Sequence, residues 1–121
     1  MNIRRVVPNI ETVRIAEVRD FYVEALGFEV AMDLGWIVTL ASPSNPTAQI
    51  QLLGHDASAP MVPALSVEVA DVDAAHRAAV ERGLEIEHPL TDEPWGVRRF
   101  FVRDPSGTVV NVVSHRPGGT G

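Results

Sequence analysis

Apolar and polar residues alternate along two stretches of the chain, residues 4–11 and 64–69. A period of two predicts a strand in each stretch. Each stretch is followed by apolar residues at helical spacing, which predicts helices over residues 15–26 and about 72–82. Asp71 is placed to cap the second helix, and Gly27 and Gly83 are placed to end the two helices. The predicted apolar stripes are Ile15, Val18, Tyr22 and Ala25 in the first helix, and Val72, Ala75, Ala79 and Val80 in the second.

Three further strands are predicted after each helix. They lie near residues 28–33, 36–41 and 48–53 in the first half, and near 84–88, 97–103 and 108–114 in the second. The segment Asp-Pro-Ser-Gly at 104–107 is typical of a tight turn between the last two strands. Both halves therefore have the order βαβββ, and the predicted fold class is α+β.

The two halves also resemble each other in sequence. Gly-Phe-Glu-Val at 27–30 corresponds to Gly-Leu-Glu-Ile at 83–86, and Gln-Leu-Leu-Gly-His at 51–55 corresponds to Asn-Val-Val-Ser-His at 111–115. An internal repeat of this kind indicates two copies of one structural unit. We expect a single domain with module one at about 3–55, a linker at 56–62, module two at about 63–115 and a disordered tail at 116–121.

Alternation also assigns the residues of each strand to one of two sheet faces. Leu65, Val67 and Val69 should pack under the second helix, and Val6, Pro8 and Ile10 under the first. The opposite face is mixed polar in both modules, where Asn9 corresponds to Ser66, Glu11 to Glu68 and Gln51 to Asn111. Phe100 and Phe101 face opposite sides, so one belongs to the core. A polar sheet face is either a ligand cleft or a solvated surface, and the pattern leaves both open.

Composition narrows the classes of partner. The 121 residues carry a formal charge of −6, which disfavours nucleic acid and would favour a cationic ligand. There is no cysteine, so disulfides, thiol nucleophiles and cysteine-based zinc sites are excluded, and we expect a cytoplasmic protein. No apolar run approaches the roughly 20 residues of a membrane span, so no membrane partner is expected.

Several segments together resemble the vicinal oxygen chelate family, which includes glyoxalase I, extradiol dioxygenases and bleomycin-resistance proteins. They are Phe-Tyr-Val-Glu-Ala-Leu-Gly-Phe at 21–28, Asp-Val-Asp-Ala-Ala at 71–75 and the stretch from Trp95 to Gly107. The resemblance covers nearly the whole chain. It implies paired βαβββ modules whose curved mixed sheets surround a cleft, and it implies a homodimer.

Enzymes of this family hold a divalent metal with His, Glu or Gln at four strand positions. The resemblance places these positions at Val7, Gln51, Ala64 and Asn111. Two of these residues have no ligand atom, and the other two offer neutral amides, which are poor partners for a divalent ion. We therefore expect no cofactor, with a divalent metal held by non-standard ligands as the alternative.

Other candidate residues each have a functional and a structural interpretation. Glu11 and Glu68 could form an acid–base pair or an acidic rim, although pairing with surface arginines such as Arg98 or Arg99 is the favoured interpretation. His55 and His115 could supply a displaced metal site, but solvated strand ends are favoured. The tryptophans Trp36 and Trp95 could stack on a ligand or fill a core or dimer contact.

The function that these observations favour is metal-independent binding of a small organic molecule, cationic or aromatic, such as an antibiotic sequestered in the bleomycin-resistance manner. The alternatives are a metal-dependent lyase, isomerase or dioxygenase, and a non-catalytic interaction or regulatory domain. Whether the chain is an enzyme is left open. The predicted ligand-binding residues are Asn9, Glu11, Trp36, Gln51, Glu68, Trp95 and Asn111.

Overall fold

The computed structural model describes residues 1–116, so the predicted disordered tail lies outside the described residues except for Arg116. The chain divides into two compact units. Val7–Val62 form the first unit, and Met1–Val6 with the chain from Pro63 onward form the second. Within residues 1–116, no helix is long and apolar enough to cross a membrane.

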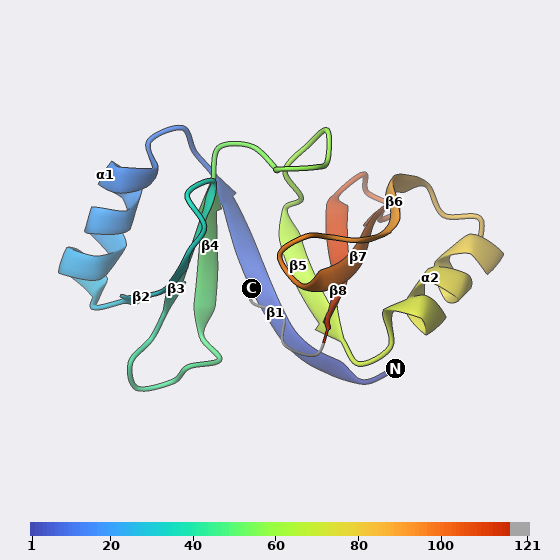
Figure 1. The fold of residues 1–121 in the computed structure, drawn as a ribbon, viewed down its shortest axis with the longest axis horizontal. Helices are drawn as coiled ribbons and strands as arrows, with labels where there is room; N and C mark the ends of the chain where they lie inside the picture. The colour runs from blue at the N-terminus through green and yellow to red at the C-terminus, as the bar shows by residue number, and fades with distance from the viewer. Residues whose placement is uncertain (117–121) are drawn as a thin grey trace. The chain divides into compact units, whose positions relative to one another are not determined.

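The first unit carries strands in the order β2-β3-β4-β1 (Figure 1). β1 pairs parallel with β4, whereas β3 pairs antiparallel with both β2 and β4. One helical segment links β1 to β2. The elements are β1 (Ile3–Glu11), α1 (Ile15–Asp20), the π-helical turn η1 (Phe21–Ala25), β2 (Glu29–Asp33), β3 (Ile37–Ala41) and β4 (Gln49–Leu53).

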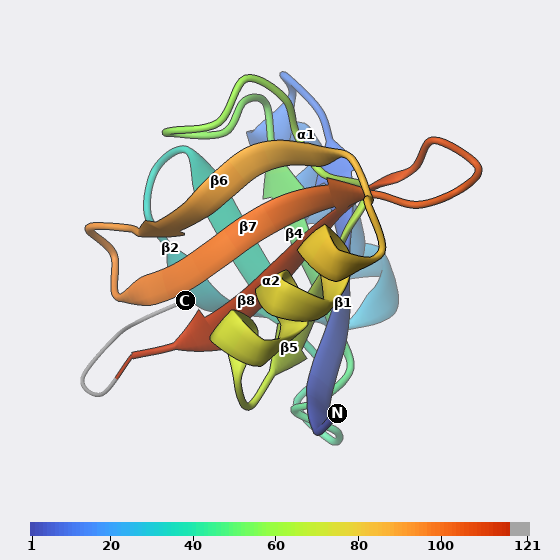
Figure 2. The same cartoon turned by 90° about the vertical axis from the view of Figure 1, so that its right-hand side faces the viewer.

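The second unit repeats this plan with the strand order β5-β8-β7-β6, and Figure 2 shows α2 lying across one face of its sheet. β5 and β8 are parallel, and the remaining pairs are antiparallel. The elements are β5 (Leu65–Val69), α2 (Val72–Glu81), β6 (Ile86–Asp92), β7 (Val97–Arg103) and β8 (Val109–His115). The predicted α+β fold of two βαβββ modules is confirmed.

The first helix packs as predicted at its start and differently at its end. Ile15, Val18 and Tyr22 contact the core made by Val38, Leu40 and Leu52. Ala25, however, is exposed, and Val23 packs on the core instead. The helix widens into a π-turn after Asp20, so the α-helical spacing that placed Ala25 on the buried face no longer applies there.

The second helix follows its predicted stripe except at Val80. Val72, Ala75 and Ala79 are buried against Phe100, whereas Val80 is 54% exposed. The predicted cap at Asp71 is present, because its carboxylate accepts a hydrogen bond of 3.0 Å from the backbone N–H of Ala74. Gly83 follows with a φ of 68°, a left-handed conformation that favours glycine at a helix end.

Two strand predictions need correction. In β1, only Ile10 packs on the helix-side core, while Val6 and Pro8 are exposed and Val7 is buried. Helix α1 therefore covers only the end of that strand. β6 extends to Asp92, beyond the predicted residue 88, because bulges between Ile86 and Thr91 let Pro89 sit in this edge strand.

Candidate functional site

A row of polar side chains crosses the first unit on the sheet face away from the helix. Asn9 of β1 is the direct partner of Gln51 of β4, which is in turn the partner of Thr39 of β3. The side-chain Nε2 of Gln51 donates a hydrogen bond of 3.1 Å to Thr39 Oγ1. Gln51 and Thr39 are both buried, so this bond satisfies polar groups that would be costly to leave unpaired.

The second unit has the corresponding row. Ser66 of β5 is the partner of Asn111 of β8, which is the partner of Phe101 of β7. Asn111 is 8% exposed, and its Nδ2 donates a hydrogen bond of 2.9 Å to Ser66 Oγ. Its Oδ1 has no hydrogen-bond partner among the described residues. The two registers match the equivalence of Asn9 with Ser66, and of Gln51 with Asn111, that the sequence predicts.

Glu68 lies two residues beyond Ser66 on the same face and is held between two basic side chains. Arg5 Nε lies 2.9 Å from Glu68 Oε1, and His115 Nδ1 lies 3.3 Å from Glu68 Oε2. Glu68 is thus paired with an arginine, as the favoured interpretation expected, but its partner is Arg5 and not Arg98 or Arg99. Arg98 binds Asp73 and Asp92 instead, and Arg99 binds Glu93. His115 is not simply a solvated strand end, because its imidazole reaches this carboxylate.

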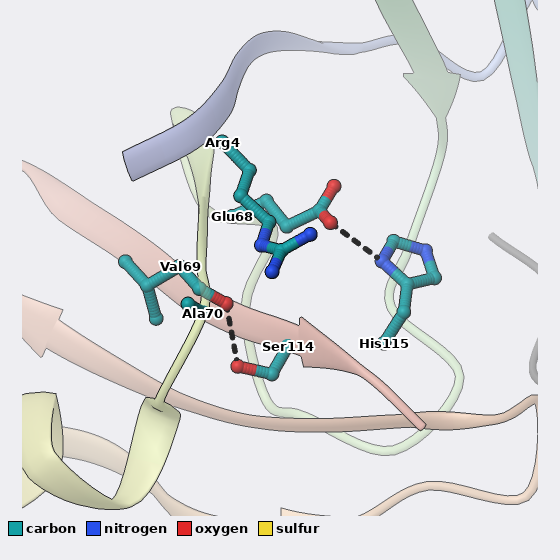
Figure 3. Close-up of a pocket in the computed structure, with 6 residues that line it drawn as sticks. All are labelled: Arg4, Glu68, Val69, Ala70, Ser114 and His115. Atoms are coloured by element: carbon teal, nitrogen blue, oxygen red, sulfur yellow. Dashed lines mark hydrogen bonds and ion pairs between the residues drawn. The ribbon is translucent and has the colours of Figure 1, made fainter. Parts of the chain in front are cut away.

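These residues border a pocket of about 170 Å³, shown in Figure 3. Arg4, Glu68 and His115 supply its ionisable side chains, and Ser114 closes one side by donating a 2.7 Å hydrogen bond to the carbonyl of Val69. Arg4 lines the pocket with Glu68, and Arg5, which is not part of the lining, pairs with the same carboxylate, so two guanidinium groups stand against one carboxylate. The local charge therefore favours an anionic group, although the whole chain is acidic.

A second group of buried charges, which the sequence reasoning missed, lies around Glu93. Arg99 Nε is 2.6 Å from Glu93 Oε2, and His88 Nε2 is 3.2 Å from the same oxygen. All three side chains are buried. The Arg99 guanidinium also lies over two aromatic rings, 4.9 Å from the centroid of Trp95 and 4.8 Å from that of Phe101. Such stacking stabilises the cation.

One signal in the sequence could have shown this group. Arg99 alternates with Val97 and Phe101 in β7, so it occupies the face opposite Phe100 and the helix. Phe100 belongs to the helix-side core, as one of the two phenylalanines was predicted to do. A charged residue on a strand face whose neighbours are both apolar needs a buried counter-charge, and Glu93 supplies it.

The remaining predicted residues are distributed over both units. In the first unit, Glu11 is exposed, and the ring centroid of Trp36 lies 6.4 Å from that of His55. In the second unit, Trp95 is half-buried beside Arg99. Within residues 1–116, no group of three His, Cys, Asp or Glu side chains is placed to hold a metal ion.

The ion pair between Arg98 and Asp73 in the second unit lowers the pKa of the aspartate. Arg98 Nη2 lies 2.9 Å from Asp73 Oδ1, in the first turn of α2. The hydrogen bond from Arg98 holds the pKa of Asp73 below its usual value, and burial opposes this shift only partly. Arg98 of β7 thus links this strand to α2 through an ion pair at the surface.

Comparison with known proteins places this arrangement in a family. Residues 9–112 match the model of the Glyoxalase/Bleomycin resistance protein/Dioxygenase superfamily. The chain belongs to this superfamily. The match covers both βαβββ modules and confirms the resemblance carried by the segments at 21–28, 71–75 and 95–107. No curated protein matches the sequence.

Several solved structures share the fold of this chain. The NAD-dependent benzaldehyde dehydrogenase of Legionella pneumophila gives a TM-score of 0.74 at 17% identity, covering 92% of this chain and 99% of that one. A superfamily member from Vibrio splendidus 12B01 gives 0.67 at 21% identity, with coverage of 93% and 99%. Methylmalonyl-CoA epimerase from Mycobacterium tuberculosis gives 0.67 at 20% identity, with coverage of 97% and 89%. At these identities the likeness concerns the fold alone.

The residues at the four metal positions of the glyoxalase superfamily do not fit a divalent ion. Val7 is 1% exposed and, like Ala64, has no side-chain ligand atom. The amide nitrogens of Gln51 and Asn111 are directed to Thr39 and Ser66, and these amides bring no charge. An ion would lose its hydration shell without gaining an anionic or imidazole ligand from these positions.

Proposed function

We propose that this member of the glyoxalase superfamily binds a small organic molecule without a metal and without transforming it, in the manner of a bleomycin-resistance protein. The observation that carries the proposal is the donor set at the four metal positions. Val7 and Ala64 offer no ligand atom. The amide nitrogens of Gln51 and Asn111 donate hydrogen bonds to neighbouring hydroxyl groups. Hydrogen bonding and stacking then remain as the means of recognition.

The second unit supports a ligand that carries an anionic group together with a hydrogen-bond donor. Arg5 pairs with Glu68 and offsets its charge, which leaves the guanidinium of Arg4 at the border of the pocket in Figure 3 for an anionic ligand group. Asn111 Oδ1 is a buried acceptor in the next row of the same face. A ligand N–H or O–H that bound it would recover about 1–3 kcal/mol of desolvation cost. This anionic group replaces the cationic ligand that the net charge of the whole chain favoured.

The aromatic part of the ligand would stack on tryptophan. Trp95 and Trp36 are both half-buried, so each ring keeps some accessible surface. Asn9, Glu11, Gln51 and Glu68 remain the other proposed polar contacts, each in its own unit. An aromatic carboxylate that also bears an amine or hydroxyl group combines the features that the second unit can recognise.

A tryptophan-fluorescence titration tests the proposal. Chelator-dialysed protein is titrated with a panel of aromatic carboxylates, antibiotics and matched neutral amides. We expect saturable quenching by at least one carboxylate, and an affinity about tenfold lower in Arg4→Gln, because the ligand loses a charged hydrogen bond. Arg14→Gln, in an exposed pair with Glu17, is the matched control and should not change the affinity.

Three results would contradict the proposal. One is stoichiometric metal that persists through dialysis and is needed for ligand quenching. Another is the absence of quenching across the whole panel, which would favour a non-catalytic interaction domain. The third is conversion of a ligand during the titration, followed by chromatography, which would show an enzyme.

We also propose that the protein is a cytoplasmic homodimer. The lack of cysteine is consistent with a reducing compartment. The first unit exposes large apolar side chains, with Phe21 56% and Leu26 59% accessible, and these would be covered in a dimer. Sedimentation equilibrium should give a mass near twice 13.1 kDa, and a monomer at micromolar concentration would refute the dimer.

A further inference from the structure

The second unit contains an apolar cavity on the helix side of its sheet, opposite the polar face described above. Its volume is about 280 Å³. Helix α2 contributes Ala75, Ala78 and Ala79, the strands contribute valines and Phe100, and Met1 and Ile3 lie at the N-terminal side. The space is an apolar groove that is open to solvent, because Ala78 and Arg82 of the helix and Met1 and Ile3 at the N-terminal side are exposed. An exposed apolar depression of this kind often marks a binding site.

The cavity exists because α2 presents small side chains to the sheet. Ala75 and Ala79 are buried in the core cluster, but valines such as Val67 and Val112 remain only partly buried beneath the helix. Larger residues at the alanine positions would fill the gap. An aliphatic lining offers almost no hydrogen-bond partners, so water gains little by entering and an apolar occupant is favoured.

One charged side chain lines this cavity. Arg82, the C-cap residue of α2, is exposed, and its side chain forms no hydrogen bond or ion pair among the described residues. An occupant with a hydrocarbon body and a single anionic end matches this arrangement. The hydrocarbon would replace solvent against the valines and alanines, and the anion would meet the guanidinium at the helix end.

We propose that this cavity binds a medium-chain aliphatic carboxylate, with its chain between α2 and the sheet and its carboxylate at Arg82. The volume is slightly below the range of about 300–1,000 Å³ that is usual for ligand pockets, which suits a single short chain rather than a ring system. The site is separate from the polar face, so its occupancy does not depend on the proposed function.

A chain-length series tests the apolar part. Hexanoate, octanoate and decanoate are titrated into the full-length protein by isothermal calorimetry, with methyl NMR spectra of the valines recorded in parallel. We expect affinity to rise roughly fourfold for each added methylene until the cavity is full, since each buried methylene contributes a constant transfer free energy. Shifts should concentrate at Val67, Val102 and Val112.

Two variants test the geometry. Ala78→Leu places a larger side chain at the exposed rim and should abolish octanoate binding, whereas Ala74→Leu, on the same helix but outside the lining, should leave it unchanged. Arg82→Gln should weaken octanoate two- to fivefold, as expected for an exposed ion pair, and leave octanol unaffected. Circular dichroism confirms that each variant is folded.

The proposal is overturned if no saturable octanoate binding is seen, or if Ala78→Leu binds octanoate as the native protein does. It is also overturned if Ala78→Leu converts a dimer into a monomer while octanoate fails to bind, because the cavity is then part of an interface between two copies.

Discussion

The buried group around Glu93 allows one quantitative prediction. Glu93→Gln removes a charge while keeping the size of the side chain and its ability to hydrogen-bond His88. Arg99 would then be a buried cation, 4% exposed in its side chain, without the carboxylate that lies 2.6 Å away in the native protein. Removing one partner of a buried ion pair costs about 3–5 kcal/mol.

We expect a loss of about 3 kcal/mol, at the lower end of this range. The rings of Trp95 and Phe101 continue to stabilise the guanidinium, because both remain stacked on it. For a chain of this size, such a loss lowers the Tm by roughly 10 °C. Urea unfolding at pH 7, followed by far-UV circular dichroism, measures the free energy of unfolding directly.

Two further variants make the prediction specific. Glu17→Gln makes the same chemical change in an exposed pair with Arg14, and should change stability by less than about 0.5 kcal/mol. Glu93→Gln combined with Arg99→Met removes the uncompensated charge, and should be more stable than Glu93→Gln alone by about 1–2 kcal/mol. A Glu93→Gln protein within about 0.5 kcal/mol of the native one would refute the reasoning.

Three other perturbations follow from the second unit. Asp71→Ala removes the helix cap and should cost about 1 kcal/mol in urea unfolding, whereas Asp71→Asn should be nearly neutral. Phe100→Ala should cost about 3–5 kcal/mol, while Val80→Ala, at an exposed position, should change stability by less than about 0.5 kcal/mol; equal effects would contradict the core assignment. The pKa of Asp104 is held below its usual value first by the hydroxyl of Ser106 and then by backbone N–H groups, so its contribution is present above pH 4 and is lost as pH falls through the lowered pKa. Asp104→Asn should therefore flatten the stability profile below pH 4, and an unchanged profile would contradict this.

Much of the fold could be predicted because burial on one side of an element is a local property. Alternation in β5 identified Leu65, Val67 and Val69 as the helix side, and the structure packs Val67 and Val69 there. The errors arose where backbone geometry changes the spacing. In the π-turn after α1, Val23 packs on the core in place of Ala25. The hydrophobic periodicity of the sequence does not predict a π-turn.

The candidate site was predictable only in part. The internal repeat aligned Gln51 with Asn111, and the registers place both amides beside a short hydroxyl side chain. The partners of Glu68 were missed because they come from β1 and β8, which lie far from it in sequence. The Glu93–Arg99 pair was missed because it depends on the bulged register between β6 and β7.

The division of β1 between two units has a consequence for the order of events during synthesis. Arg4 is synthesised well before Glu68 and His115, with which it lines the pocket of Figure 3. Arg5 likewise precedes Glu68, its ion-pair partner. The first unit can fold from residues 7–62 before the residues that pack against the segment 1–6 have been synthesised. A nick in the linker before Pro63 would leave a C-terminal fragment without Arg5 and without the backbone bond from Ala70 to Asn2. The pocket is thus completed only after the strand that carries His115 has been synthesised and has met the segment that carries Arg4.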